Sequence, residues 1–131
     1  MSNRRLIISG VALGMILLIF NIGCRHSPSN ISNQPAVCFG TEVLPLFQSN
    51  CAKSGCHNGQ GESDLNLSNA SGIRRNVVPG KPLDSRIYSA ITDTCGNIMP
   101  PPPNAPLPTG ARTQIYIWIL QGADTTCKGA E

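Results

Sequence analysis

Two cysteines and a histidine lie close together in this chain, in the stretch Cys51-Ala-Lys-Ser-Gly-Cys56-His57. Two thiols followed directly by a histidine are typical of a covalent haem site, in which the thiols bind the porphyrin and the imidazole binds the iron. The common motif has two residues between the cysteines, whereas four stand here, and Gly55 allows this longer loop to bulge. The pattern predicts one covalent haem c on Cys51 and Cys56, with His57 as the proximal ligand.

The same three side chains allow two other interpretations. Cys51 and Cys56 could form a short-loop disulfide with each other, or they could bind zinc together with His57. Structural zinc usually has four ligands that come from two separate pairs. No second pair of cysteines or histidines is evident in the sequence. Haem is therefore favoured, and the disulfide and the zinc site stay open as alternatives.

A single methionine, Met99, follows the N-terminal apolar segment, and the four residues after it, Pro100 to Pro103, are all prolines. A proline run holds the backbone extended, so it can present a weak thioether ligand with little loss of entropy. A Met/His pair on haem iron is typical of electron carriers and raises the reduction potential. His57 and Met99 are thus the candidate axial ligands. The alternative for Met99 is an apolar side chain that fills space in a proline-rich loop.

The first 23 residues have the pattern of an export signal. Two arginines precede an apolar segment from Leu6 to Phe20, which is shorter than the roughly 20 residues that a bilayer span needs. Cys24 follows a glycine and is similar to the lipid-modified cysteine of bacterial lipoproteins. We predict a signal peptide over residues 1–23 and a lipid-anchored protein in the periplasm or at the outer membrane. An uncleaved anchor helix and simple secretion are the alternatives.

The rest of the chain divides into a tether and a single small domain. Residues 24–37 are polar and rich in Ser and Asn, which predicts a flexible tether. Residues 38–131 are near the size at which a peptide core alone is thin, so a haem would be the largest apolar body in this domain. Without the signal, eight basic residues face seven acidic ones, and nothing indicates nucleic-acid binding. Arg74-Arg75 is expected to be a solvated loop or a contact to a haem propionate.

Catalytic patterns are absent from the sequence. It contains no Ser/His/Asp set, no paired carboxylates and no phosphate-binding glycine loop. With His57 on the iron, no histidine base remains in the domain. The sequence therefore predicts an electron carrier and not an enzyme.

Helical periodicity predicts three helices, of which the first spans residues 41–50. Thr41 is its expected cap, and Phe47 lies on its apolar face and is expected in the core. Pro45 has no amide hydrogen, so we expect an irregular start. Residues 58–76 are rich in Gly, Ser and Asn and are expected to form a loop with one or two turns that covers one haem face.

The second helix is expected to begin with Asp84 or a neighbour as its cap and to end near Ile91. Leu83, Ile87 and Ile91 are spaced four apart, which places them on one face of such a helix. Tyr88 is expected to be an amphipathic wall residue.

The third helix, over residues 109–121, has the strongest pattern. Thr109 is its expected cap, and Gly122 is expected to end it. Three of its residues share an apolar face and are expected in the core: Ile115, Trp118 and Ile119.

Several segments follow one another in the order of the planctomycete-type cytochrome c domain, which the chain resembles. They are Val43-Leu-Pro-Leu-Phe-Gln-Ser-Asn-Cys51, the Cys-His site, Val78-Pro-Gly-Lys-Pro with Ser85-Arg-Ile-Tyr, Met99-Pro-Pro, and Ile115-Tyr-Ile-Trp-Ile-Leu-Gln-Gly-Ala123. The similarity covers about Cys38 to Ala123. It implies an all-α, cytochrome c-like fold in which about three to five short helices wrap one haem c. The haem is then bonded to Cys51 and Cys56, with His57 proximal and Met99 distal.

The resemblance also implies a hydrogen bond and a disulfide. In cytochromes c a proline carbonyl in the region of Pro79 accepts a hydrogen bond from the proximal histidine and fixes its ring. The first and last helices cross in such folds, and Cys38 precedes the first while Cys127 follows the last. We therefore expect a Cys38–Cys127 disulfide, worth about 4 kcal/mol for so long a loop. Cys95 is then left as a free thiol.

Together these features predict a single-haem, membrane-tethered cytochrome c that passes electrons between redox partner proteins. The sequence does not name those partners. Two other hypotheses stay open. One is a haem-based redox or gas sensor in which Met99 leaves the iron, and the other is a haem-free, disulfide-stabilised interaction domain.

Overall fold

The computed structural model of the chain describes residues 34–60, 64–93 and 98–127. These ranges belong to the second of the chain's two compact units, residues 31–131. The expected signal peptide, Cys24, most of the tether, and Cys95 lie outside the described residues. Within the described ranges, no helix is both long enough and apolar enough to cross a membrane.

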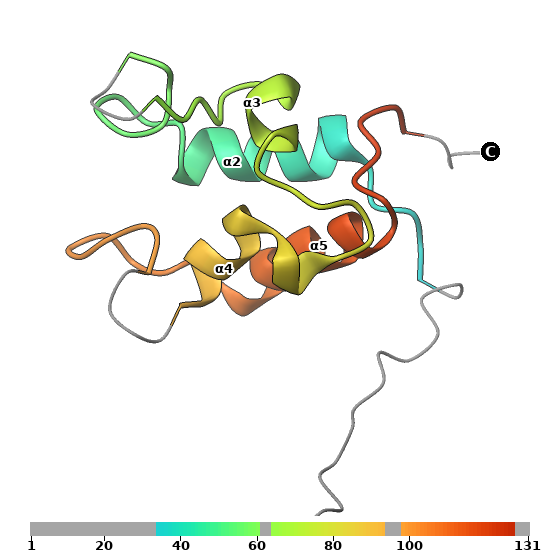
Figure 1. Cartoon of the computed structure of the whole chain (residues 1–131). Helices are drawn as coiled ribbons and strands as arrows, with labels where there is room; N and C mark the ends of the chain where they lie inside the picture. Colours follow the sequence, from blue (N-terminus) through green and yellow to red (C-terminus); the bar gives the residue numbers. More distant parts are fainter. Residues whose placement is uncertain (1–33, 61–63, 94–97, 128–131) are drawn as a thin grey trace, which may run out of the picture. The chain divides into compact units, whose positions relative to one another are not determined.

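The described part is helical, as the sequence predicts (Figure 1). Its only extended pairing is an isolated bridge between Asn58 and Asn66. The elements in chain order are a π-helical turn η2 (Phe39–Val43), α2 (Leu44–Asn50), α3 (Ala70–Arg74), a 3-10 turn η3 (Pro82–Asp84), α4 (Arg86–Thr92) and α5 (Thr109–Leu120).

The first predicted helix is split into η2 and α2. Pro45 occupies the first turn of α2, where its missing amide hydrogen costs nothing because the first amides of a helix have no partner inside it. This is the irregular start that the proline predicts. The prediction that Thr41 caps this helix is wrong. Thr41 lies inside η2, and Cys38 occupies the N-cap position. The amide of Cys38 instead donates to the carboxylate of Glu42, at 2.6 Å.

The predicted loop over residues 58–76 contains the short helix α3. The side chain of Asn69 caps it by accepting a hydrogen bond from the amide of Gly72, at 2.9 Å. Gly72 also lies so close to the preceding loop that a Cβ atom there would be 1.6 Å from the carbonyl oxygen of Asn66. Glycine is therefore required at this contact. The loop buries Leu67 and half-buries Leu65.

The second predicted helix is α4 (Arg86–Thr92), and Ser85, the neighbour of Asp84, occupies its N-cap position, in agreement with the prediction of Asp84 or a neighbour. Asp84 itself lies in η3. The hydroxyl of Ser85 accepts from the amide of Val78 at 2.9 Å and donates to the carbonyl of Lys81 at 2.9 Å, so it stabilises the preceding turn and makes no capping hydrogen bond to α4. Because Leu83 precedes the helix, its expected place on the apolar face is wrong, and it is 74% exposed.

The last helix, α5, has the predicted core face and end. Gly122 ends it with a φ of +102°, which glycine adopts without strain. Thr109 is its first helical residue and not its cap, because Pro108 occupies that position. Buried residues from η2, α2, α4 and α5 form one core, which includes Val43, Phe47, Ile87, Ile91, Ile115 and Ile119. Phe39 and Trp118 belong to the same core, and their ring centroids are 5.3 Å apart. At the edge of this core, Tyr88 of α4 contacts Tyr116 of α5, with ring centroids 5.3 Å apart.

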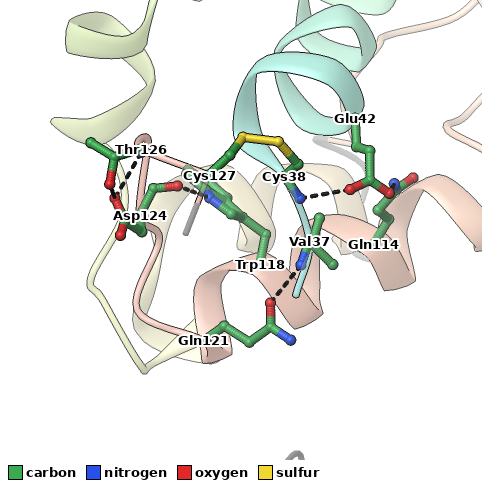
Figure 2. Close-up of a disulfide and its surroundings, with 9 residues drawn as sticks. All are labelled: Val37, Cys38, Glu42, Gln114, Trp118, Gln121, Asp124, Thr126 and Cys127. Carbon is green, nitrogen blue, oxygen red and sulfur yellow. Dashed lines mark hydrogen bonds between the residues drawn. A yellow bond between two sulfur atoms is a disulfide. The ribbon is translucent and has the colours of Figure 1, made fainter. Parts of the chain in front are cut away.

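A disulfide between Cys38 and Cys127, the pairing implied by the resemblance, joins the two ends of this unit (Figure 2). Hydrogen bonds surround it. The side-chain amide of Gln121 accepts from the amide of Val37 at 2.9 Å, and the indole N–H of Trp118 donates to the carbonyl of Asp124 at 2.8 Å. The segment before η2 and the segment after α5 are thus both hydrogen-bonded to side chains of α5 or of its C-terminal end.

Candidate functional site

The loop after α2 and the proline-rich loop after α4 lie at the same end of the unit (Figure 1). A cavity of about 230 Å³ lies between residues of the two loops. Its walls contain all four residues that the sequence assigns to the haem, namely Cys51, Cys56, His57 and Met99. The remaining residues on its walls are Asn50, Lys53, Gly55, Pro100, Pro101 and Asn104.

A second cavity, of about 170 Å³, shares Cys51, His57 and Met99 with the first. It extends toward the core, and most of its remaining walls are apolar: Phe47, Leu65, Leu67, Ile87, Ala90 and Ile91. Asn76 and Arg86 are the other described residues on these walls. Together the two cavities reach the size of protein sites for small organic ligands, which begins near 300 Å³.

The turn after α2 carries His57 back to the end of this helix. The amide of His57 donates to the carbonyl of Cys51 at 3.1 Å, and the carbonyl of His57 accepts from the amide of Leu67 at 2.7 Å. Gly55 has a φ of +78°, a conformation that side chains other than glycine rarely adopt. This is the backbone freedom that the four-residue loop was expected to need. His57 is half-buried in this arrangement.

Met99 is positioned by α4. Its amide donates to the carbonyl of Ala90 at 2.8 Å, so the start of the proline-rich loop is attached to the helix. The Met99 side chain is 36% exposed and lies on the walls of both cavities. Met99 and His57, far apart in the sequence, thus lie around the same space.

Cys51 and Cys56 are both free thiols, so the short-loop disulfide between them is not formed. Cys51 is buried and Cys56 is exposed. Burial raises the pKa of Cys51 from its ordinary value of 9.0 to about 11; the neighbouring Cys56 adds to the increase and Lys53 partly opposes it. Cys51 is therefore a neutral thiol at neutral pH. Among residues 34–60, 64–93 and 98–127, no three His, Cys, Asp or Glu side chains are placed to bind a metal ion together, so the structure does not support the zinc site.

Pro79 lies outside both cavities and is exposed. Its turn is attached to α5 through the amide of Gly80, which donates to the carbonyl of Ile119 at 2.8 Å. The expected hydrogen bond between Pro79 and His57 stays a prediction.

Arg74 and Arg75 were expected to be a solvated loop or a propionate contact, and the structure places neither on the cavity walls. The guanidinium of Arg74 donates to the carbonyl of Ala123. Arg75 is exposed and lines neither cavity. Arg86, which does line one, was not singled out from the sequence. The sequence feature that could have indicated Arg86 is its place in the segment Ser85-Arg-Ile-Tyr, which belongs to the family resemblance.

A helical unit with two free thiols, an imidazole and a thioether around one largely apolar space has the ligand set of a c-type cytochrome. Comparison with known families agrees, because residues 54–103 match the planctomycete cytochrome c family. Over these residues the chain is similar to a planctomycete-type cytochrome c domain. The matched segment includes Cys56, His57 and Met99 and begins after Cys51. Searches of curated proteins and of solved structures gave no significant match.

Proposed function

We propose that this protein is a single-haem c-type cytochrome that transfers electrons, with thioether bonds from Cys51 and Cys56 and with His57 and Met99 as axial ligands. The observation that supports it is the common cavity whose walls these four side chains share. The family match supports a cytochrome-like domain independently of that geometry.

The residues present fit a haem c. Thioether attachment needs thiols that are not consumed in a disulfide, and Cys51 and Cys56 are both free although another cysteine pair in the chain is oxidised. The walls near His57 are mostly apolar, as a porphyrin face requires. When bound, the haem supplies the one-electron redox chemistry.

The chain contributes ligation, burial and rigidity. The backbone hydrogen bonds of His57 to Cys51 and Leu67 hold the imidazole at the cavity, and that of Met99 to Ala90 holds the thioether there. Buried Phe47 and Ile91 exclude water from part of the wall. A Met/His ligand pair in apolar surroundings favours a high reduction potential. His57 and Met99 would both hold the haem iron, so these residues suit an electron carrier and would leave no ligand position for a substrate.

The exposure of Met99 favours one alternative, a haem-based redox or gas sensor. A thioether is a weak ligand, and a side chain that is 36% exposed can leave the cavity without disrupting the core. Rapid binding of carbon monoxide by the reduced protein at neutral pH would support the sensor and contradict the carrier.

We place the domain outside the cytoplasm, anchored by a lipid on Cys24 through the polar tether, where redox partner proteins can reach it. The Cys38–Cys127 disulfide supports an oxidising compartment, because such bonds are rare in the cytosol. Replacement of Cys24 by serine is expected to release the protein from the membrane fraction. Membrane retention of the Cys24→Ser variant would contradict the lipid anchor.

The deciding experiment is export of the full chain together with haem c maturation proteins, followed by denaturation, acid-acetone washing and a pyridine haemochrome spectrum. A c-type spectrum is expected from the wild type. The Cys51→Ser/Cys56→Ser variant should retain no haem, and a Cys38→Ser/Cys127→Ser variant serves as the matched control for cysteine removal, since these cysteines lie outside the site. Absence of haem from the wild type, under conditions that mature a control cytochrome, would contradict the proposal and favour a haem-free interaction domain.

A further inference from the structure

We propose that Arg86 is the residue that binds a carboxylate of the cofactor, as the counter-ion of a haem propionate. This inference rests on the proposed function, since it concerns the same site. Nothing in the sequence or the family match assigns a role to this side chain.

Among the residues that the structure describes, Arg86 is the one permanently charged residue on the walls of the 170 Å³ cavity. It begins α4, and it shares these walls with His57 and Met99. A mostly apolar wall with a guanidinium suits a ligand that is mostly apolar and carries an anionic group at its edge. Guanidinium groups match the planar geometry of a carboxylate and can bind it through two parallel hydrogen bonds.

The position of Arg86 at the cavity is supported by the backbone. The amide of its neighbour Ile87 donates to the carbonyl of Asn76 at 3.2 Å, and Asn76 is on the same cavity wall. The Asn76 side chain in turn donates to the carbonyl of Gly72 within α3 at 3.0 Å, so the start of α4 is hydrogen-bonded to a residue that is itself held against α3. The Arg86 side chain itself is exposed and has no hydrogen-bond or ion-pair partner within the described part of the chain. Its donors are therefore available to a ligand.

The other cations are less suitable. Arg74 is bound to the carbonyl of Ala123, and Arg75 and Lys81 line neither cavity. Lys53 lines the 230 Å³ cavity, but it lies between the two cysteines that would bond the vinyl groups. In a haem the two propionates are on the edge of the ring away from those vinyl groups. Arg86 lines the cavity that includes Cys51 but not Cys56, and it begins α4, whereas both cysteines belong to the turn after α2.

A cation at the propionate has a measurable effect on the iron. Its charge opposes the extra positive charge of ferric iron and so favours the reduced state. Because the Arg86 side chain is exposed, salt screens part of this effect. Removal of the charge should lower the reduction potential, and the decrease should be larger at low ionic strength than at high.

The test is the midpoint potential of the haem-loaded protein in three variants, measured at low and at high salt. Arg86→Gln removes the charge, Arg86→Lys keeps it, and Arg75→Gln makes the same chemical change at an exposed arginine away from both cavities. We expect a lower potential for Arg86→Gln, a potential close to wild type for Arg86→Lys, and a smaller shift for Arg75→Gln. Equal shifts for Arg86→Gln and Arg75→Gln would overturn the assignment.

The two proposals fail in distinguishable ways. If the wild type retains no covalent haem, the proposed function is wrong and the role of Arg86 falls with it. If the wild type has covalent haem but Arg86→Gln shifts the midpoint potential no more than Arg75→Gln does, the proposed function stands and the propionate contact is wrong. Thermal unfolding of each variant, followed by circular dichroism, checks that a shift in potential does not come from partial unfolding.

Discussion

The amide of Met99 donates a hydrogen bond to the carbonyl of Ala90, at 2.8 Å, so the proposed distal ligand is attached to the helix that also carries Arg86. Met99 and His57 therefore face a common space from two different loops. The position of the thioether depends on α4 as well as on the prolines that follow it.

Replacement of Met99 by leucine should change the iron site and leave the fold intact. The two side chains have similar volumes, so the free energy of unfolding should fall by less than about 1.5 kcal/mol. Loss of the thioether should lower the reduction potential of the haem-loaded protein and open the iron to carbon monoxide. Visible spectra of the oxidised and reduced variant provide the measurement. A spectrum and a potential identical to those of the wild type would show that Met99 only fills space in the loop.

Removal of the Cys38–Cys127 disulfide should destabilise the domain by about 2–5 kcal/mol, as is typical for a native disulfide in a small exported domain. Urea unfolding of wild type and of the Cys38→Ser/Cys127→Ser variant measures the difference. Addition of a dithiol reductant is expected to bring the wild type to the stability of the variant and to leave the variant unchanged. If the reductant destabilised the variant equally, the stabilising bond would lie elsewhere.

Gly72→Ala should be one of the most damaging small substitutions in the chain. The added Cβ would lie 1.6 Å from the carbonyl oxygen of Asn66, and this contact is to backbone that cannot move without disturbing the loop. We expect a loss of about 1–3 kcal/mol, as for other overpacked sites. Gly110→Ala is the matched control, because a Cβ there has no atom within 4 Å and the site lies in α5. It should be neutral or stabilising by up to about 1 kcal/mol. A smaller loss at Gly72 than at Gly110 would contradict the close contact.

In the haem-free protein, Cys56 should react with iodoacetamide faster than Cys51 at pH 8. Cys56 is exposed, whereas Cys51 is buried and its pKa is raised to about 11, so few Cys51 side chains are thiolates at this pH. Since the folded protein holds the Cys51 proton more tightly than the unfolded chain, this group stabilises the fold below about pH 9 and loses that contribution as the pH rises toward 11. Peptide mass spectrometry gives the two rates. In urea the rates should become similar; equal rates in the native protein would show that Cys51 is not buried.

Local sequence patterns were sufficient for several parts of the fold. Ile87 and Ile91 are buried at helical spacing, and the end of α5 at Gly122 follows from the conformational freedom of glycine. The split of the first helix follows from the amide hydrogen that Pro45 lacks. Each of these features depends on one residue type or on the helical period, so neighbours in the sequence determine it.

The prediction for Leu83 was misleading because the residues around it form the separate turn η3. The hydroxyl of Ser85 bonds to Val78 and Lys81, α4 begins after Ser85, and Leu83 is left in solvent. Arg74 was a candidate for the propionate, but its guanidinium is bound to the carbonyl of Ala123 at the far end of the chain. No local rule predicts the contact of Arg74 with Ala123, because the two residues are 49 positions apart and meet only when the chain packs.

The sequence by itself determined the chemical groups of the site: two thiols next to an imidazole, and one thioether held in a proline run. Only the tertiary structure decided that His57 and Met99 share a cavity, that Cys51 is buried while Cys56 is exposed, and that Arg86 lines the mostly apolar cavity beside them. The physical reason is that a ligand's identity is a property of one side chain. Its distance, burial and charge environment come from the packing of α2, α4 and the two loops against one another.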